Sequence, residues 1–198
     1  MFEGGEGSGK STQVQLMAAR LRSSYDTEVV VTFEPGATAR GALLRKFLLD
    51  DDSPLEPRAE LLLMAADRAQ HCGEVVGPAL ARGAVVLCDR FEPSSLAYQG
   101  VGRGLGVETV ELVSGVARGP VTPDLVIVLD VSDTIAARRR PTADDRIEQA
   151  GDEFHARVRA AYRDLAATRG WNVIDASGTV DNVHASVWEA VSKAIDRP

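Results

Sequence analysis

The sequence predicts one three-layer α/β domain built around a mainly parallel sheet. Short apolar runs alternate with longer stretches of helical periodicity along the chain, and such alternation is typical of α/β architecture. Two of the runs, residues 84–88 and 125–129, are continuously apolar, as strands buried on both faces of a parallel sheet are. A length of 198 residues fits one domain, so we expect residues 1–198 to form a single unit.

Four strands are predicted from β-branched or apolar runs bounded by turn residues such as Pro35, Gly83, Pro123 and Gly170. They cover residues 28–33, 84–88, 125–129 and 171–175. Five helices are predicted from stripes of apolar residues that recur at helical spacing. Breaks are expected near Gly73 and Pro78 in the second of them. The stripes are Val14, Met17 and Leu21; Leu61, Leu62, Ala65, Ala69 and Val76 within residues 56–82; Val107, Val110, Val113 and Ala117; Phe154, Val158, Ala161 and Leu165; and Val183, Val187, Val191 and Ile195.

Composition excludes several classes of protein. Hydrophobic residues make up 44% and charged residues 26%, which is ordinary for a globular chain and excludes disorder and coiled coils. The net charge of −7 argues against a nucleic-acid binder, which usually has a basic domain. Two cysteines make no disulfide scaffold. No apolar run reaches the ~20 residues of a spanning helix, and an acidic third residue argues against a leader peptide. We therefore expect a cytoplasmic protein without membrane contact.

A glycine-rich segment near the start carries the strongest functional signal, because it matches G-x-x-x-x-G-K-[ST] in full. Glycines let the backbone curl with its N–H groups inward, and the following helix N-terminus favours a bound phosphate. Lys10 is expected to reach the β- and γ-phosphates of ATP, and Ser11 to bind Mg²⁺. The predicted nucleotide-binding residues are Gly4, Gly5, Glu6, Gly7, Ser8, Gly9, Lys10, Ser11 and Thr12.

Polar residues after the second apolar strand and within the long helical stretch indicate a second pocket. Asp89 and Arg90 close a strand, where ligand-contacting residues of parallel sheets lie. Arg90 would hold an acceptor phosphate, and Asp89 would lie near Mg²⁺ or orient Arg90; the alternative is a surface ion pair. Arg68 offers a fork of donors that suits a pyrimidine carbonyl, or else lies along a core helix with its head in solvent. The Gln99 amide suits a base edge.

The motifs also bear on the class of phosphate-binding protein. No Asn-Lys-x-Asp segment for reading guanine is present, and the chain is too short for a motor ATPase. The order and spacing of the remaining motifs resemble the thymidylate kinases nearly end to end. These motifs are Glu34-Pro35-Gly36-Ala37-Thr38, Ala66-Asp67-Arg68-Ala69-Gln70-His71, Asp89-Arg90-Phe91, Ser94-Ser95-Leu96-Ala97-Tyr98-Gln99-Gly100, Gly102-Arg103-Gly104, Pro123-Asp124-Leu125 and Asp145-Arg146-Ile147-Glu148-Gln149.

The resemblance implies a P-loop kinase fold with a five-stranded parallel sheet in the order 2-3-1-4-5. It implies phosphoryl transfer from ATP to dTMP with Mg²⁺, and a homodimer to which the helix at residues 107–117 contributes. It assigns the acceptor phosphate to Arg90 and the thymine ring to Arg68. The full implied substrate set is Glu34, Met64, Arg68, Asp89, Arg90, Ser95, Tyr98 and Gln99, and the implied Mg²⁺ ligands are Ser11 and Asp89.

An arginine cluster is expected to form a lid over residues 138–149. Four arginines within nine residues, interrupted by Pro141, bring positive charge that stabilises the transferring phosphoryl group on closure. Members of the family place a catalytic basic residue either in the phosphate loop or in the lid. This loop carries Glu6 and no basic residue before Lys10, so the lid should supply it. Which of the three candidates does so stays open: Arg138, Arg139 or Arg140.

Three positions depart from the family pattern. Met64 stands where an aromatic ring usually stacks on thymine, Phe33 where an arginine is frequent, and Phe91 where a tyrosine is frequent. These departures leave two alternatives to dTMP phosphorylation. One is a kinase for another nucleotide or nucleoside. The other is a catalytically weak nucleotide-binding module with a regulatory role.

The first strand is the remaining departure. A phosphate loop normally follows a buried central strand of about five residues, and here Met1-Phe2-Glu3 alone precede Gly4. A truncated central strand would leave backbone N–H and C=O groups of the two adjacent strands without hydrogen-bond partners. It would also leave a gap in the core. We therefore expect either that translation starts further upstream or that this kinase is part of a longer polypeptide.

Overall fold

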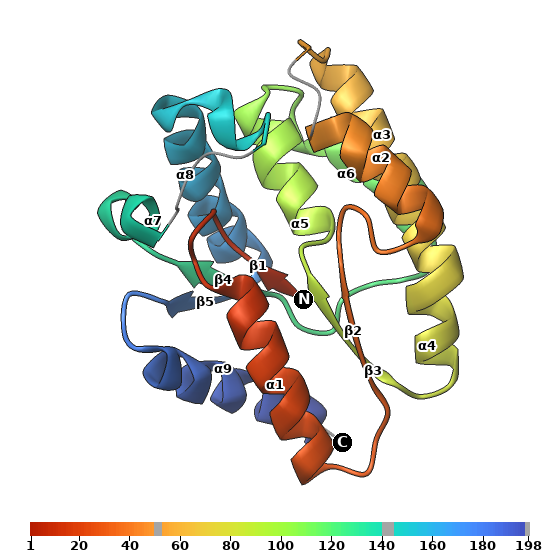
Figure 1. Cartoon of the computed structure of the whole chain (residues 1–198), viewed down its shortest axis with the longest axis vertical. Helices are drawn as coiled ribbons and strands as arrows, with labels where there is room; N and C mark the ends of the chain where they lie inside the picture. Colours follow the sequence, from red (N-terminus) through yellow and green to blue (C-terminus); the bar gives the residue numbers. More distant parts are fainter. Residues whose placement is uncertain (50–52, 140–144, 197–198) are drawn as a thin grey trace.

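The sheet has five parallel strands in the order β2-β3-β1-β4-β5, as predicted (Figure 1). This computed structural model describes residues 1–49, 53–139 and 145–196. The four strands predicted from apolar runs are all present, each within two residues of the expected bounds. The strands are β1 (Phe2–Glu3), β2 (Val29–Phe33), β3 (Val85–Asp89), β4 (Ile127–Asp130) and β5 (Asn172–Asp175).

Helices connect the strands. The predicted break near Gly73 is a wider helical turn, η1, rather than an interruption, and Pro78 lies in the first turn of α4. The helix α2 was not predicted. The helices are α1 (Lys10–Ser24), α2 (Ala39–Leu49), α3 (Pro57–His71), η1 (Cys72–Val76), α4 (Gly77–Ala81), α5 (Glu92–Ser95), η2 (Leu96–Gly102), α6 (Val107–Arg118), α7 (Asp133–Arg139), η3 (Glu148–Ala150), α8 (Asp152–Arg169) and α9 (Val180–Ile195).

Two layers of helices cover the sheet. On one face α1 and α9 pack side by side against it (Figure 1), and Val14, Met17 and Leu21 are buried there. On the other face α3, η2, α6 and α8 enclose a second core that contains Leu61. Leu62 is an exception to its predicted stripe, since it is 59% exposed, and Ala69 is also exposed.

The short central strand sets the position of the phosphate loop. In β1, Phe2 pairs with Asp89 of β3 and with Ile127 of β4, and its side chain is buried. Gly4 therefore leaves the sheet beside the last residue of β3. The glycine-rich loop and the Asp89–Arg90 pair lie together at the carboxyl edge of the sheet, where parallel sheets bind ligands.

Candidate active site

The glycine-rich loop has the backbone that the motif predicts. It runs from the end of β1 to α1, which begins at Lys10 directly after Gly9 with φ of 90°. Gly4 and Gly7 also have positive φ, at 133° and 71°. A Cβ at position 4 would overlap the Leu129 carbonyl oxygen, and one at position 7 would lie 2.8 Å from the Ala136 carbonyl oxygen. Glycine is therefore required at both positions, since other residues rarely adopt this conformation.

Lys10 lies folded inside the loop. Its Nζ donates to the Gly5 carbonyl oxygen at 2.9 Å and lies 3.5 Å from the Ser8 hydroxyl. Burial, followed by the neighbouring charge of Arg90, lowers the pKa of Lys10 to about 8. The amine is a cation at neutral pH and stays charged until the pH rises through about 8. This is the point charge that a phosphate loop directs at a triphosphate.

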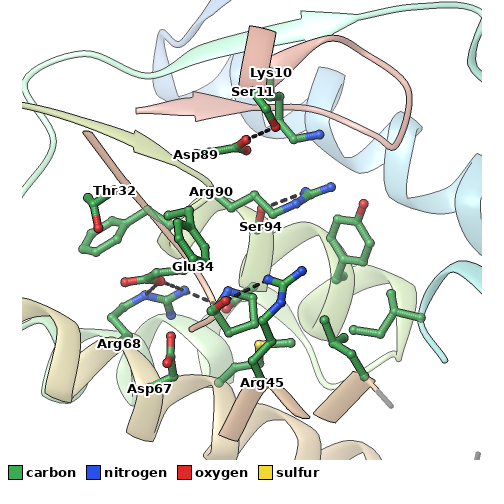
Figure 2. A pocket seen from close by; sticks show the side chains of 18 of the residues that line it. Lys10, Ser11, Thr32, Glu34, Arg45, Asp67, Arg68, Asp89, Arg90 and Ser94 are labelled. Carbon is green, nitrogen blue, oxygen red and sulfur yellow. Dashed lines mark hydrogen bonds and ion pairs between the residues drawn. The ribbon is translucent and has the colours of Figure 1, made fainter. Parts of the chain in front are cut away.

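Ser11 and Asp89 bring together the first turn of α1 and the end of β3. The Ser11 hydroxyl donates to Asp89 Oδ2 at 2.6 Å (Figure 2). Hydroxyl and carboxylate oxygens are ligands that Mg²⁺ accepts, usually with waters and substrate phosphates completing its shell. The two predicted metal ligands therefore fit the ion. Thr12 follows Ser11 on α1 and is exposed.

Arg90 is held against the loop in a strained conformation. Its φ of 69° is positive, which is uncommon for a residue with a side chain. The guanidinium pairs with Glu6 and donates to the Gly4 carbonyl oxygen at 3.1 Å and to Ser94 Oγ at 3.2 Å. The charge of Arg90, more than any other cause, lowers the pKa of Glu6 to about 2. Glu6 is thus an ionised partner of Arg90 that faces the substrate cavity.

The buried carboxylate of Glu3 hydrogen-bonds to residues that surround Arg90. Glu3 is fully buried, accepts the Phe91 backbone N–H at 2.8 Å, and accepts the Ser94 and Tyr162 hydroxyls at 2.7 and 3.0 Å. Burial raises the pKa of Glu3, and these hydrogen bonds oppose that effect. Sequence reasoning missed Glu3, Ser94 and Tyr162 as site residues, because no local pattern links positions so far apart.

A cavity of about 520 Å³ extends from the glycine-rich loop into the helical layer, a volume that suits a nucleotide. In Figure 2, Lys10 and Ser11 lie at one end of this cavity, and Glu34 and Arg68 lie toward the other. Every predicted substrate-binding residue lines it, together with Glu6, Lys10 and Ser11 of the loop: Glu34, Met64, Arg68, Asp89, Arg90, Ser95, Tyr98 and Gln99.

Glu34 and Arg68 form a buried ion pair rather than two independent ligand groups. Arg68 Nε and Nη2 contact Glu34 Oε2 at 3.0 and 2.9 Å. Glu34 Oε1 lies 2.8 Å from His71 Nδ1, and the other ring nitrogen of His71 lies 2.6 Å from the Thr32 hydroxyl. Both oxygens of Glu34 are therefore engaged. Its role here is to fix Arg68 in the cavity wall.

The remaining donors of Arg68 are also largely committed. Nη2 donates to Ser95 Oγ at 3.1 Å and Nη1 to Ser114 Oγ at 3.3 Å. Since a guanidinium carries five N–H groups, one hydrogen of Nη1 has no acceptor among the described residues. That single hydrogen is what Arg68 can offer to a base carbonyl.

Tyr98 provides an unsatisfied hydroxyl in the cavity wall. The side chain is buried, and among the residues that the structure describes its hydroxyl has no hydrogen-bond partner. Burial raises the pKa of Tyr98 to about 12, so the group is a neutral donor and acceptor. Buried polar atoms usually have hydrogen-bond partners. An unpaired hydroxyl beside a nucleotide-sized cavity therefore indicates that a polar group of a ligand binds to it.

Two of the three departures from the family pattern, Phe33 and Phe91, have different structural consequences. Phe33 is 43% exposed and lines the cavity, and the Arg45 guanidinium lies 5.8 Å from its ring centroid. Arg45 also donates to the Pro35 carbonyl oxygen at 2.8 Å. A positive charge is thus present beside Phe33, supplied from α2. Phe91 is fully buried, with Arg68 Cζ 5.2 Å from its ring centroid.

The structure does not bring the described lid arginines to the cavity. Arg138 and Arg139 are the last two residues of α7, and neither of them lines the cavity. Arg139 donates to the Ala176 carbonyl oxygen at 3.0 Å. Arg140 lies outside the described residues. Arg146 is committed elsewhere, because it donates to the Leu48 carbonyl oxygen and to Glu60. The catalytic role predicted for Arg138, Arg139 or Arg140 stays a prediction.

One cavity with a phosphate loop at one end and buried polar groups at the other allows two phosphorylated substrates to meet. This fold and this site define the class of P-loop kinases. Within that class, the family model described as thymidylate kinase matches residues 2–187. The chain therefore belongs to the thymidylate kinase family.

Individual relatives agree with this assignment. The chain is 46% identical to a thymidylate kinase from Synechococcus sp. (strain JA-3-3Ab), covering 100% of this chain and 98% of the relative. It is 47% identical to one from Pelotomaculum thermopropionicum, covering 99% and 93%. Among solved structures, thymidylate kinase from Ehrlichia chaffeensis superposes with a TM-score of 0.78 at 31% identity, covering 96% of this chain and 95% of the other.

Proposed function

We propose that this chain transfers the γ-phosphoryl group of ATP to the 5′-phosphate of dTMP, giving dTDP and ADP. The observation that carries the proposal is one continuous cavity with a phosphate loop at one end and buried base-reading groups at the other. The same activity is in the names of the relatives. None of the comparisons supports the two alternatives, a kinase for another nucleotide or a regulatory module.

At the donor end, Lys10 and the backbone amides of the loop hold the β- and γ-phosphates. Ser11 and Asp89 would hold Mg²⁺, which supplies charge neutralisation to the transferring group when bound. These residues are fixed before substrate arrives, Lys10 by Gly5 and Ser11 by Asp89. Preorganised charges of this kind stabilise the transition state without a reorganisation cost.

At the acceptor end, Arg90 holds the dTMP phosphate beside the loop and the Tyr98 hydroxyl binds the sugar. Arg68 donates its remaining Nη1 hydrogen to a thymine carbonyl, and Met64 packs on the ring through its polarisable sulfur. The lid is expected at residues 138–149, of which 140–144 lie outside the described residues, and one of its arginines is expected to reach the transferring phosphoryl group when both nucleotides are bound. This closed arrangement excludes water and favours transfer to dTMP over hydrolysis.

The active form is a homodimer. Five large apolar side chains that are more than half exposed lie on three neighbouring helices, α2, α3 and α6 (Figure 1). These residues are Leu43, Phe47, Leu62, Leu112 and Val116. Isolated exposed apolar residues are common, but a group on adjacent helices is typical of a subunit interface. Val116→Glu should shift the chain toward monomer in sedimentation experiments, and an unchanged dimer would exclude α6 from the interface.

The reaction takes place in the cytoplasm. Cys72 and Cys88 are free thiols buried in the core, which suits a reducing compartment. In the described part of the chain, no helix is both long enough and apolar enough to cross a membrane.

Product analysis tests the proposed reaction. The purified chain with ATP, dTMP and Mg²⁺ should yield ADP and dTDP in equal amounts, and a chelator that removes Mg²⁺ should stop both. ADP release that is independent of dTMP, without dTDP, would contradict the proposal.

A further inference from the structure

A buried carboxylate lies directly behind the nucleoside pocket. Glu60 of α3 is 0% exposed and is outside the residues that line the cavity. Three side chains converge on it: Gln99 Nε2 at 2.8 Å from Oε1, Arg103 Nη2 at 3.1 Å from Oε2, and Arg146 Nη2 at 2.7 Å from Oε2. A fully buried carboxylate is costly unless such partners satisfy it. Gln99 lines the cavity, as do Asp145 and Ile147 on either side of Arg146, so two of the partners of Glu60 connect it to the cavity wall.

The charge of Glu60 determines which end of the Gln99 amide faces it. Burial by itself raises the pKa of Glu60, but the Gln99 hydrogen bond and the Arg103 charge outweigh it and hold the pKa below its usual range. An ionised carboxylate accepts hydrogen bonds and donates none. The Gln99 nitrogen must therefore face Glu60, although the two ends of an amide are otherwise hard to distinguish.

This arrangement leaves the Gln99 oxygen available to a ligand. Gln99 lines the cavity and is 2% exposed. Its Nε2 gives one of its two hydrogens to Glu60, and none of the described residues donates a hydrogen bond to its Oε1. Oε1 is therefore an acceptor that Gln99 can present to a nucleobase. Thymine and uracil carry an N–H donor at N3, whereas cytosine carries a lone pair there.

We propose that Glu60 is a positioning residue for base selection, which holds Gln99 so that Oε1 accepts the N3–H of thymine or uracil. This inference rests on the proposed function in taking dTMP as the acceptor. A cytosine in the same position would set its N3 lone pair against Oε1. Because the unpaired acceptors would then be buried, the site rejects cytosine even though the two rings are similar in size.

A purely structural role for Glu60 predicts a different outcome. Arg103 and Arg146 also pair with Glu60, so the carboxylate ties η2 and residues 146–150 to α3. If that tie were its only function, a substitution at Glu60 would lower kcat/KM by the same factor for every acceptor nucleotide. If Glu60 orients Gln99, the ratio of kcat/KM for dTMP to kcat/KM for dCMP must change.

The substitution Glu60→Gln separates these outcomes. A glutamine at position 60 can donate to Gln99 and so stabilise the flipped amide, which presents Nε2 to the base. We expect kcat/KM for dTMP relative to dCMP to fall about tenfold or more, mainly through KM, as loss of one buried hydrogen bond implies. The matched control is Glu74→Gln, because Glu74 accepts from Gln70 at 2.6 Å in an exposed pair; its ratio should not change. Equal losses on both acceptors in Glu60→Gln would overturn the proposal.

Two further variants keep the test decisive. In a Gln99→Ala background, Glu60→Gln should leave the dTMP-to-dCMP ratio unchanged, because the two residues act as a unit; additive effects would overturn the proposal. If Glu60→Gln does not fold, Glu60→Asp retains the charge for the arginines but withdraws the carboxylate from Gln99, and it should lower the same ratio.

Equilibrium binding distinguishes this inference from the proposed function. Calorimetric titration with dTMP and dCMP needs no turnover, so a chain that fails to make dTDP still reports on base selection. A wild-type chain that binds the two nucleotides equally would overturn the role of Glu60, whatever its kinase activity.

Discussion

The two ends of the cavity are built differently. The donor end comes from one contiguous segment, residues 4–12, together with Asp89, and Lys10, Ser11 and Asp89 line the cavity there. The acceptor end draws on β2, α3, α5, η2 and α6, and its charged groups mostly bind one another, as Glu34 and Arg68 do. Phosphate is thus recognised by local backbone geometry, whereas the base is recognised by a long-range network. Substitutions at the donor end should affect rate, and those at the acceptor end should affect stability and KM.

The largest effect is expected at Lys10. The variant Lys10→Ala removes the charge that stabilises the transferring phosphoryl group, so kcat should fall by at least about 10²–10³-fold. Its free energy of unfolding should not decrease, because burial of the charged amine is itself unfavourable. Steady-state kinetics and denaturant unfolding measure both quantities. The control Lys46→Ala, at an exposed position of α2, should change neither, and a Lys10→Ala variant with near-normal kcat would exclude the loop from catalysis.

At the acceptor end the main effect should be on stability. Arg68→Ala leaves Glu34 buried without its cation, which should cost about 3–5 kcal/mol in the free energy of unfolding. Arg58→Ala on the same helix removes an ion pair whose arginine side chain is 81% exposed, so it should cost less than about 1 kcal/mol. Urea denaturation measures the difference, and equal losses would show that the buried pair does not stabilise the acceptor end.

Two tyrosines refine the comparison further. Tyr98→Phe removes a hydroxyl that has no described partner, so stability should not fall while KM for dTMP rises about five- to tenfold. Tyr162→Phe removes a hydroxyl that donates to Glu3 and should destabilise the fold by about 1–2 kcal/mol. A Tyr98→Phe variant with lower stability and unchanged KM would contradict the proposed ligand contact.

The smallest effect is a pH dependence from Asp67. Burial, aided by the Glu34 charge, raises the pKa of Asp67 to about 6, and its Oδ2 has no described partner. The folded state therefore binds this proton more tightly than the unfolded chain does. The resulting stabilisation is complete below about pH 4, the unfolded value, and is lost as the pH rises through about 6.

Asp67→Asn tests this assignment, because the amide keeps an acceptor for the Gly36 N–H but does not titrate. Between pH 4 and 7 the wild-type free energy of unfolding should fall relative to that of the variant. Parallel curves over this range would show that Asp67 keeps an ordinary pKa in the fold.

What the sequence could predict follows the same division. The loop, the strand order and part of the cavity lining were predicted, because each depends on a local motif or on a family pattern. The helix α2 was not predicted for two reasons. Gly41 lies within it and is a poor helix former, and its apolar residues Leu43 and Phe47 are exposed, so they form no buried stripe. The pairing of Glu34 with Arg68 joins positions 34 residues apart, and no sequence periodicity reports such a contact.

The position of Arg146 illustrates a further limit. In the sequence it belongs to a run of arginines and resembles a phosphate ligand, but in the structure it pairs with Glu60. Charge patterns show which residues carry charge without showing which buried partner neutralises them. The same limit applies to Phe33, where the sequence shows a lost arginine and the structure shows Arg45 beside the ring.

An acceptor panel tests the central claim most directly, namely that a buried network at the acceptor end reads thymine while a local loop reads phosphate. Turnover of ATP is measured with dTMP, dUMP, dCMP and AMP at equal concentrations. The structure predicts that dTMP is the preferred acceptor, with dCMP and AMP far below it. A preference for dCMP or AMP, or turnover that is the same with every acceptor, would contradict the account.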